Sequence, residues 1–235
     1  GNYNPKTARL YEDMGILTSD PEVGEDLTRL FNQLSGVAPR SKFKRLLVAP
    51  RHIRDGLVER VERQVERQQR TGDGYVAVKV NSLVDEGTID ALYRASQAGV
   101  RVDVWVRGIC AIRPGVPGLS ETIRVHSVLG RFLEHSRIFL FGTGADREAW
   151  IGSADLMHRN LDRRVEALVR IKEPRHIDQV FDLVERGMSG DYAHWSLDGD
   201  GRWTRVHQGA DGAPLPDIQA ALIAMHAKRR RKARR

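Results

Sequence analysis

The chain has 235 residues, of which 40% are hydrophobic and 29% charged, a composition typical of a globular protein with one large or two small domains. It contains no apolar run near the roughly 20 residues that a membrane span requires. The single cysteine, Cys110, excludes an intramolecular disulfide framework and predicts a cytoplasmic protein. The formal net charge of +7 predicts an anionic partner, but net charge alone does not separate nucleic acid from another polyanion or a membrane surface.

Residues 1–42 are expected to form a first unit that ends in a helix. Asp20 followed by Pro21 is typical of a helix start, and Gly36 is typical of a helix end. Phe31 lies near the end of this helix, where most aromatic side chains belong to a core.

Residues 43–190 alternate between strand and helix patterns and form the second unit. Short apolar runs predict strands at residues 46–49, 75–80, 100–106 and 123–127. Amphipathic periodicity predicts helices at residues 53–70, 89–98 and 173–188. Such alternation predicts an α/β sandwich with a largely parallel sheet, whose ligands bind beyond the carboxyl ends of the strands. Two of these ends carry Asn81 and Arg107.

Residues 191–235 form the third predicted unit. Asp-Gly turns near residue 200 indicate a small hairpin, and a helix is expected from Asp217 onward. The helix runs into a basic tail, Lys228 to Arg235, which we expect to be disordered.

The longest stretch without a periodic pattern is residues 107–120. Its glycines and prolines indicate a shaped loop, in which Arg107 and Arg113 supply forked donors that suit phosphate oxygens. A surface connection with solvated arginines is the alternative, and composition alone leaves it open.

His135 lies at the start of a predicted hairpin. His135 and Arg137 precede an apolar run at residues 138–141, and a second strand passes through residues 150–151. The small turn at residues 152–155 that follows is the size of a phosphate group. Although most isolated histidines are structural, these charged neighbours favour a functional role for His135.

Basic residues and one acid follow that turn. Arg159 comes before, and Arg164 begins, an alternation of polar and apolar residues over 164–171 that predicts a strand. On such a strand Arg164 and Glu166 share one face, so guanidinium groups and a carboxylate are expected near His135.

The segments GRFLEHSRIF and WIGSADLMHRNLDRRVE resemble the second half-site of the phospholipase D superfamily, in which an H-x-K motif precedes a G-S-x-N/D turn and an acid. Here Arg137 stands at the lysine position and Gly142 replaces the usual aspartate. These departures argue against an ordinary phosphodiesterase. With GNYNPKTARLYEDMGILTSDPE and VRGICAIRPGVPGLSE, the chain is similar instead to the C-terminal half of the long-type bacterial polyphosphate kinases.

This resemblance implies a phospholipase D-like α/β/α sandwich with a mixed, largely parallel sheet, plus the remnant of a second similar domain in residues 1–42. It implies reversible transfer of the terminal phosphoryl group of ATP to polyphosphate through a phosphohistidine just upstream of Gly1. His135 becomes the second active-site histidine, Arg107 contacts the nucleotide phosphates, and Phe31 lies against the adenine base. Magnesium is expected to arrive bridged by the phosphates, since no carboxylate cluster in the sequence suggests a dedicated site.

A weak internal repeat relates the two ends of the family match. Placing Asn2 on Asp155 also puts Lys6 on Arg159 and puts the acid Asp13 on Glu166. The repeat predicts two similar half-sites, in which Asp13 and Glu166 orient the imidazoles.

The site hypothesis assigns catalysis to His135 and Glu166 and assigns no residue to a metal. The residues expected to bind nucleotide or phosphate are Arg107, His135, Phe31, Arg113, Arg137, Arg159, Arg164, Asn2 and Lys6. The expected partners are ATP or ADP and inorganic polyphosphate, and the complete enzyme is expected to be a homo-oligomer. A phospholipase D-type phosphodiesterase or phosphatidyltransferase remains an alternative. A basic nucleic-acid-binding module is another, although only 6% of residues are aromatic and could stack on bases.

Overall fold

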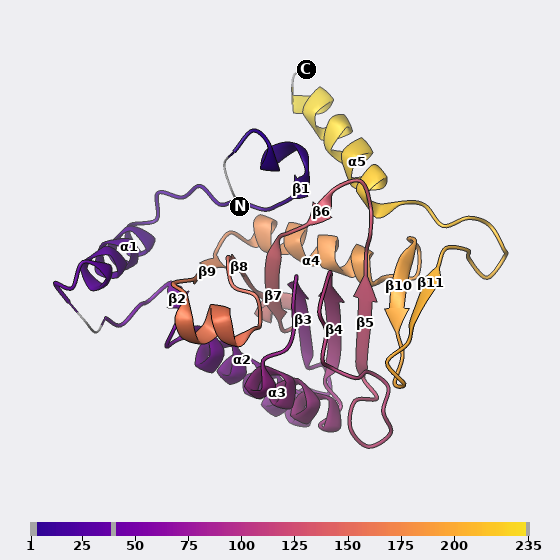
Figure 1. Ribbon diagram of the computed structural model, residues 1–235, viewed down its shortest axis with the longest axis horizontal. Coiled ribbons are helices and arrows are strands. Elements are labelled where there is room, and N and C mark those ends of the chain that lie inside the picture. The colour runs from indigo at the N-terminus through magenta and orange to yellow at the C-terminus, as the bar shows by residue number, and fades with distance from the viewer. Residues whose placement is uncertain (1–3, 39–40, 234–235) are drawn as a thin grey trace.

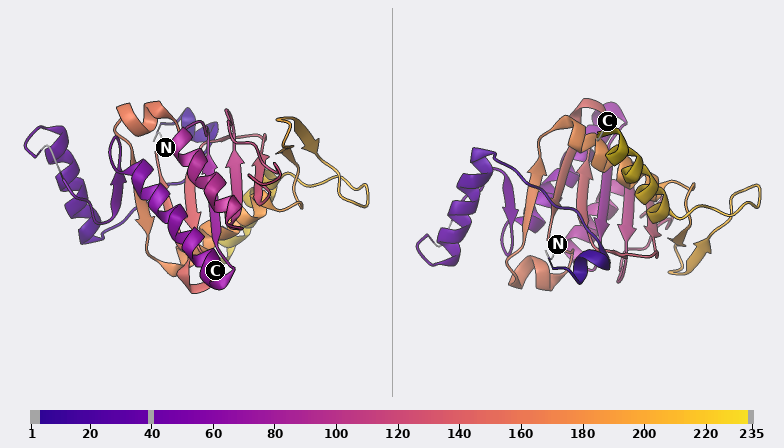
Figure 2. Two further views of the ribbon diagram at one scale, coloured as in Figure 1. Left: turned by 90° about the horizontal axis from the view of Figure 1, so that it is seen from below. Right: turned by 90° about the horizontal axis from the view of Figure 1, so that it is seen from above.

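The computed structural model describes residues 4–38 and 41–233, and a single large sheet organises them. In this part of the chain nine strands hydrogen-bond in the order β11-β10-β5-β4-β3-β7-β8-β9-β2 (Figure 1). Helices α2 (Ile53–Thr71) and α3 (Glu86–Gln97) cover one face of the sheet, and α4 (Pro174–Met188) covers the other (Figure 2). The predicted α/β/α sandwich with a mixed sheet is therefore confirmed.

The direction of most strands differs from the expectation. The strands are β2 (Leu46–Val48), β3 (Tyr75–Val80), β4 (Arg101–Val106), β5 (Ile123–Ser127), β7 (Arg137–Phe141), β8 (Glu148–Gly152), β9 (Ala167–Ile171), β10 (His194–Leu197) and β11 (Trp203–Val206). Among these described strands β3, β4 and β5 are parallel to one another, and every other pairing is antiparallel. The prediction of a largely parallel sheet was wrong because no crossover helix precedes β7, which therefore runs back along β3.

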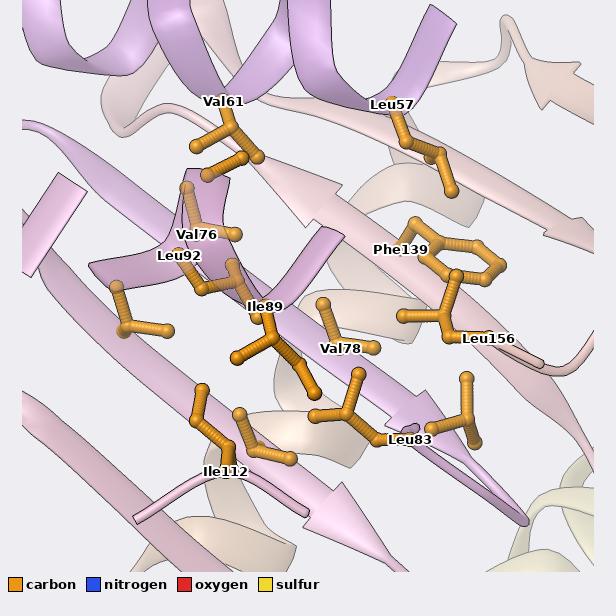
Figure 3. Packing of buried hydrophobic residues seen from close by; sticks show 14 of the residues in the cluster. Leu57, Val61, Val76, Val78, Leu83, Ile89, Leu92, Ile112, Phe139 and Leu156 are labelled. Carbon is orange, nitrogen blue, oxygen red and sulfur yellow. The ribbon is translucent and has the colours of Figure 1, made fainter. Parts of the chain in front are cut away.

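Strand alternation sends the side chains of β3 into two separate cores. Val76 and Val78 face α2 and α3, where Leu57, Val61 and Phe139 pack against them (Figure 3). Each such side chain contributes about 1.5–3 kcal/mol when it is fully buried. The alternate positions of β3, such as Tyr75 and Ala77, face α4 and form a second core with it. Lys79 is on the same face and lies against Trp105 of that core.

The first unit lies along the second one. It contains the 3₁₀ turn η1 (Thr7–Arg9), the strand β1 (Tyr11–Glu12) and the helix α1 (Pro21–Leu34). Strand β1 pairs in parallel with β6 (Leu133–Glu134), which comes just before β7. The side chain of Asp20 caps α1, as the sequence predicts, by accepting the backbone N–H of Glu22. Figure 1 shows α1 beyond β2, at the opposite side from β10 and β11.

The C-terminal part extends the sheet with β10 and β11 and then forms α5 (Ile218–Ala233). The expectation of a disordered basic tail was wrong as far as Ala233, because α5 continues through it. Alanine, lysine and arginine are strong helix formers, so a helix that starts on the packed Ile218 continues through them. Within the described residues, no helix combines the length and the apolar character needed to cross a membrane.

Candidate functional site

The candidate site lies at the edge of the sheet where β3, β4 and β8 end and β7 begins. Val80 and Val106, the last residues of β3 and β4, are register partners. Arg137, the first residue of β7, pairs with Gly152, the last residue of β8. The loops that leave these strands therefore bring Asn81, Arg107, Arg137 and Asp155 to one place, as expected for ligands beyond strand ends.

One chain of hydrogen bonds links two arginines across this edge. Arg137 donates to both oxygens of Asp155, from Nη2 to Oδ2 at 3.0 Å and from Nε to Oδ1 at 3.3 Å. The backbone N–H of Asn81 donates to Asp155 Oδ1 at 2.8 Å, and Arg107 Nε donates to Asn81 Oδ1 at 2.9 Å. Bidentate and charge-assisted bonds of this kind hold a planar guanidinium in a defined orientation.

The amide of Asn81 retains an unused donor. Because Arg107 Nε can only donate, the oxygen of the Asn81 amide must face it, and the orientation of the amide is thereby determined. Asn81 Nδ2 is buried and has no hydrogen-bond partner in the part of the chain that the structure describes. An unpaired buried donor beside two guanidinium groups marks this edge as a place for an oxygen-rich anion.

His135 is held from the side of the first unit. Its Nδ1 lies 3.0 Å from Asp13 Oδ2, and its ring lies 4.8 Å from the ring of Tyr11. Burial raises the pKa of the Asp13 carboxyl, but the hydrogen bond from His135, together with nearby positive charge and the Met14 backbone N–H, outweighs burial, so the pKa is lower than its usual value. An ionised carboxylate only accepts hydrogen bonds, so Nδ1 of His135 carries a hydrogen and donates a hydrogen bond to Asp13.

Arg137 connects His135 to the arginine network. Its Nη1 donates to the carbonyl oxygen of His135 at 2.9 Å and lies 3.1 Å from His135 Nε2. The imidazole is thus placed between a carboxylate and a guanidinium. Such an arrangement can transfer a proton at Nε2 while the adjacent guanidinium neutralises an anion.

Glu166 belongs to a different set of contacts from His135. It is buried just before β9, where its Oε1 accepts a hydrogen bond from Asn160 Nδ2 at 2.7 Å and lies 3.2 Å from Arg164 Nε. Arg159 begins the π-helical turn η3 (Arg159–Arg163) and is exposed, and Arg164, directly after the turn, is exposed too. No hydrogen bond or ion pair of the described residues joins Glu166, Arg159 or Arg164 to the network of Arg107, Arg137 and His135.

The remaining predicted residues lie elsewhere. Arg113 donates from Nη1 to the carbonyl of Gly199 at 3.3 Å, in the β10–β11 turn, which lies toward the start of β5 and away from the strand ends that carry Arg107. Phe31 is 68% exposed on α1, beyond β2. Lys6 is exposed beside η1, and Asn2 falls outside the described residues. The structure therefore does not bring Arg113 or Phe31 to the His135 network.

The carboxylates near His135 do not suit a dedicated metal ion. Asp13 accepts from His135, Asp155 is paired with Arg137, and Glu166 is held by Asn160. Among residues 4–38 and 41–233, no group of three or more acidic, histidine or cysteine side chains has the arrangement that would hold a metal. Asp13, Asp155 and Glu166 are thus each already engaged by a donor of this chain.

Comparison with protein families gives two adjacent matches. The model for polyphosphate kinase C-terminal domain 2 matches residues 46–215, and the model for polyphosphate kinase C-terminal domain 1 matches residues 1–40. This chain belongs to the polyphosphate kinase family. The match covers both the strand ends that carry Arg107 and Arg137 and the segment that carries Asp13.

Individual relatives agree with this assignment. The chain is 62% identical over 232 residues to the polyphosphate kinase of Streptomyces coelicolor and 54% identical over 226 residues to that of Mycobacterium avium. It covers 31% and 30% of their lengths, so it spans about a third of these curated relatives. The crystal structure of polyphosphate kinase from Porphyromonas gingivalis matches 97% of this chain at a TM-score of 0.87 and 35% identity, and the chain covers 35% of it.

Two members of the network were not in the site hypothesis. Asn81 was noted as a strand end and Asp155 as part of a small turn, but neither was assigned a role. Their signal was position alone, because a polar residue directly after a buried strand is often a ligand or an orienting group. Their connection to Arg107 and Arg137 depends on contacts between residues that are far apart in the sequence.

Proposed function

We propose that this chain supplies part of the ATP and polyphosphate site of a phosphotransferase that extends and shortens polyphosphate. The observation that carries the proposal is the single hydrogen-bonded network in which Arg107 and Arg137 flank Asn81 beside His135. Phosphoryl transfer demands alignment and neutralisation of charge more than covalent chemistry, and a fixed pair of guanidinium groups meets both demands.

The residues would divide the work by position. Arg107 and the unused donor of Asn81 would contact phosphate oxygens, and Arg137 would neutralise charge next to the imidazole. His135, with its Nδ1–H held by Asp13, would exchange a proton at Nε2. Mg²⁺ would accompany the nucleotide phosphates, and no step of this description depends on a metal site in the chain.

The other predicted residues would act further out. By the internal repeat, Glu166 would orient the phosphorylated histidine of the other half-site, as Asp13 orients His135. Arg159 and Arg164 would contact the polymer near Glu166, while Lys6 and Asn2 would belong to the half-site of the first unit. The homo-oligomeric state, the cytoplasmic location and the contact of Phe31 with adenine remain predictions from the sequence.

Replacement of Arg107 tests the proposed function. Arg107→Ala should weaken binding of a non-hydrolysable ATP analogue by about 1.5–3 kcal/mol, because a charge-assisted contact to phosphate is lost. Arg107→Lys should recover only part of this loss, since an ammonium group does not reproduce the fork. Isothermal titration calorimetry measures both.

Arg175→Ala provides the matched control. Arg175 is exposed on α4, so this variant removes the same charge outside the network. Its affinity should equal that of the wild-type chain. If Arg107→Ala binds as tightly as this control, Arg107 is not a phosphate ligand and the proposed site loses its main support.

A further inference from the structure

Lys79 is a buried charge that the site described above does not use. Its side chain is 2% exposed in the centre of the sheet, and its Nζ lies 4.8 Å from the centre of the Trp105 ring. Burying an ammonium group is costly unless opposite charges and hydrogen bonds surround it. The contacts of Lys79 therefore indicate what this position requires.

Its charged partners come from β1 and β6, the two short strands that pair with each other. Lys79 Nζ lies 2.9 Å from Glu12 Oε2 on β1 and 2.8 Å from Glu134 Oε2 on β6. It also donates to Ser136 Oγ at 2.6 Å, and that hydroxyl donates to Glu12 Oε2 at 2.8 Å. The central strand β3 is thus bonded through Lys79 to β1 of the first unit, which lies next to β6 in Figure 1.

The two carboxylates respond differently to this environment. Burial raises the pKa of the Glu134 carboxyl, and attraction to Lys79 does not fully offset it. Burial also acts on Glu12, but attraction to Lys79 and its hydrogen bond outweigh it, and the pKa of Glu12 is lower than usual. Of the two carboxylates, Glu12, the residue of the first unit, is thus the one whose pKa is lowered beside the ammonium group.

The pairing of β1 with β6 determines where Asp13 points. Glu12 and Glu134 are register partners, and the backbone N–H of His135 donates to the carbonyl of Glu12 at 3.0 Å. Alternation then turns the next residues, Asp13 and His135, away from Lys79 and toward each other. A slip of one residue would exchange the two faces, so that Asp13 would face Lys79 and leave His135.

The backbone of β1 does not secure this register by itself. Strand β1 has two residues, and a two-stranded pair is at best marginally stable in water. We propose that Lys79 is a positioning residue for His135: by binding Glu12 it holds β1 in register on β6 and so places Asp13 at the imidazole. This role concerns the geometry of His135 and does not depend on which substrate the site binds.

Nuclear magnetic resonance of the full chain can test the role of Lys79. In the wild-type chain, at a pH high enough for imidazoles to be neutral, the ¹⁵N shifts of His135 should show a single tautomer with the proton on Nδ1, and the amide of His135 should be protected from exchange. In Lys79→Met the tautomer preference should be lost, and the His135 amide should exchange at least about tenfold faster. A wild-type tautomer and unchanged exchange in Lys79→Met would overturn the proposal.

Two further variants separate positioning from general stability. Glu12→Gln removes the charge that Lys79 binds while keeping the shape of a partly exposed side chain, and it should reproduce both effects. It decides the question alone if Lys79→Met does not fold. Asp13→Asn should alter the ring signals of His135 and leave the amide exchange unchanged, because the β1–β6 pairing stays intact.

Glu148→Gln is the matched control. Glu148 is also a buried carboxylate of this sheet, bonded to Arg60 at 2.8 Å and to Trp150 at 2.7 Å, but it does not contact β1 or β6. Its variant should show the wild-type signals of His135. If Glu148→Gln changes them as Lys79→Met does, the effect reflects overall destabilisation and the proposed role of Lys79 is wrong.

Discussion

Two buried ionisable side chains among the described residues, Asp103 and His126, have very different surroundings. Asp103 on β4 is completely buried, and it accepts hydrogen bonds from Arg101 Nη2 at 2.7 Å, Arg124 Nε at 2.8 Å and the Tyr75 hydroxyl at 3.1 Å. His126 on β5 is also buried, but its ring stacks on another imidazole, that of His194, with 4.0 Å between centroids. Burial, followed by repulsion from His194, lowers the pKa of His126 from 6.5 to about 4, although the hydrogen bond with the Gly187 carbonyl opposes this.

This low pKa predicts a pH-dependent contribution of His126 to stability. Between pH 6.5 and about 4 the unfolded chain binds a proton at His126 that the folded chain does not bind. The free energy of unfolding should therefore decrease as the pH is lowered from 6.5 to about 4, by up to about 3 kcal/mol from this residue. His126→Gln removes the titration, so urea unfolding at pH 7, 5 and 4 should show a shallower decrease for the variant.

The exposed His176 on α4 offers the control for this experiment. His176→Gln should keep the wild-type pH dependence. Parallel curves for His126→Gln and the wild-type chain would show that His126 titrates alike in the folded and unfolded states.

At the scale of secondary structure, α4 packs very closely on β4. A methyl group at Gly187 would lie 2.0 Å from the Trp105 ring. This ring is itself buried, and Lys79 Nζ lies 4.8 Å from its centre. Neither the ring nor the helix has room to move in a densely packed interior. The absence of a side chain at Gly187 is therefore what allows α4 to cover this face of the sheet.

Substitution of this glycine should show the close packing directly. Gly187→Ala should lower the free energy of unfolding by about 1–3 kcal/mol, because overpacking forces α4 away from Trp105. Gly24→Ala is the matched change on α1, where no atom lies within 4 Å of the added methyl group. It should raise stability by about 0.5–1 kcal/mol through helix propensity. Denaturant unfolding would refute the packing argument if both variants shifted in the same direction.

At the scale of the whole molecule, one segment of the chain accounts for the net charge of +7. The tail Lys228 to Arg235 contains seven lysine and arginine residues and no acid, so its removal leaves equal numbers of basic and acidic residues. Helix α5 is anchored at its other end, where Gln219 bonds to Phe132 and Glu134. Deleting the tail therefore changes the electrostatic field of the molecule and leaves the packing of α5 in place.

Deletion of residues 228–235 should reduce the salt dependence of polyphosphate binding. Each basic residue that contacts the polyanion releases counterions, so the slope of log affinity against log salt should become shallower in the shortened chain. Binding of the ATP analogue should change little, because the described hydrogen bonds of the Arg107 network are made by Asn81, Asp155 and Arg137. Titrations at several salt concentrations measure both quantities. Loss of nucleotide binding in the shortened chain would place the tail inside the site.

Local patterns in the sequence determined most of the elements and part of the site. Asp20 and Pro21 mark the start of α1, the run at 75–80 is β3, and the apolar segments around 138–141 and 150–151 form the β7–β8 hairpin. These features are predictable because caps, periodicity and hairpin turns act over a few residues. The resemblance to the polyphosphate kinase family pointed to Arg107, His135 and Arg137 for the same reason, since their motifs are continuous in the sequence.

Tertiary structure alone decided the strand order and the partners of each charge. Lys79 is a charged residue in an otherwise apolar strand. Nothing near it in the sequence indicates that Glu12 and Glu134 will lie next to it. Asp13 and His135 are 122 positions apart in the chain, yet their side chains are in contact. Such contacts depend on the pairing of β1 with β6 and of β7 with β3. The free energy of that pairing comes from burial and charge neutralisation between distant segments, which no local pattern encodes.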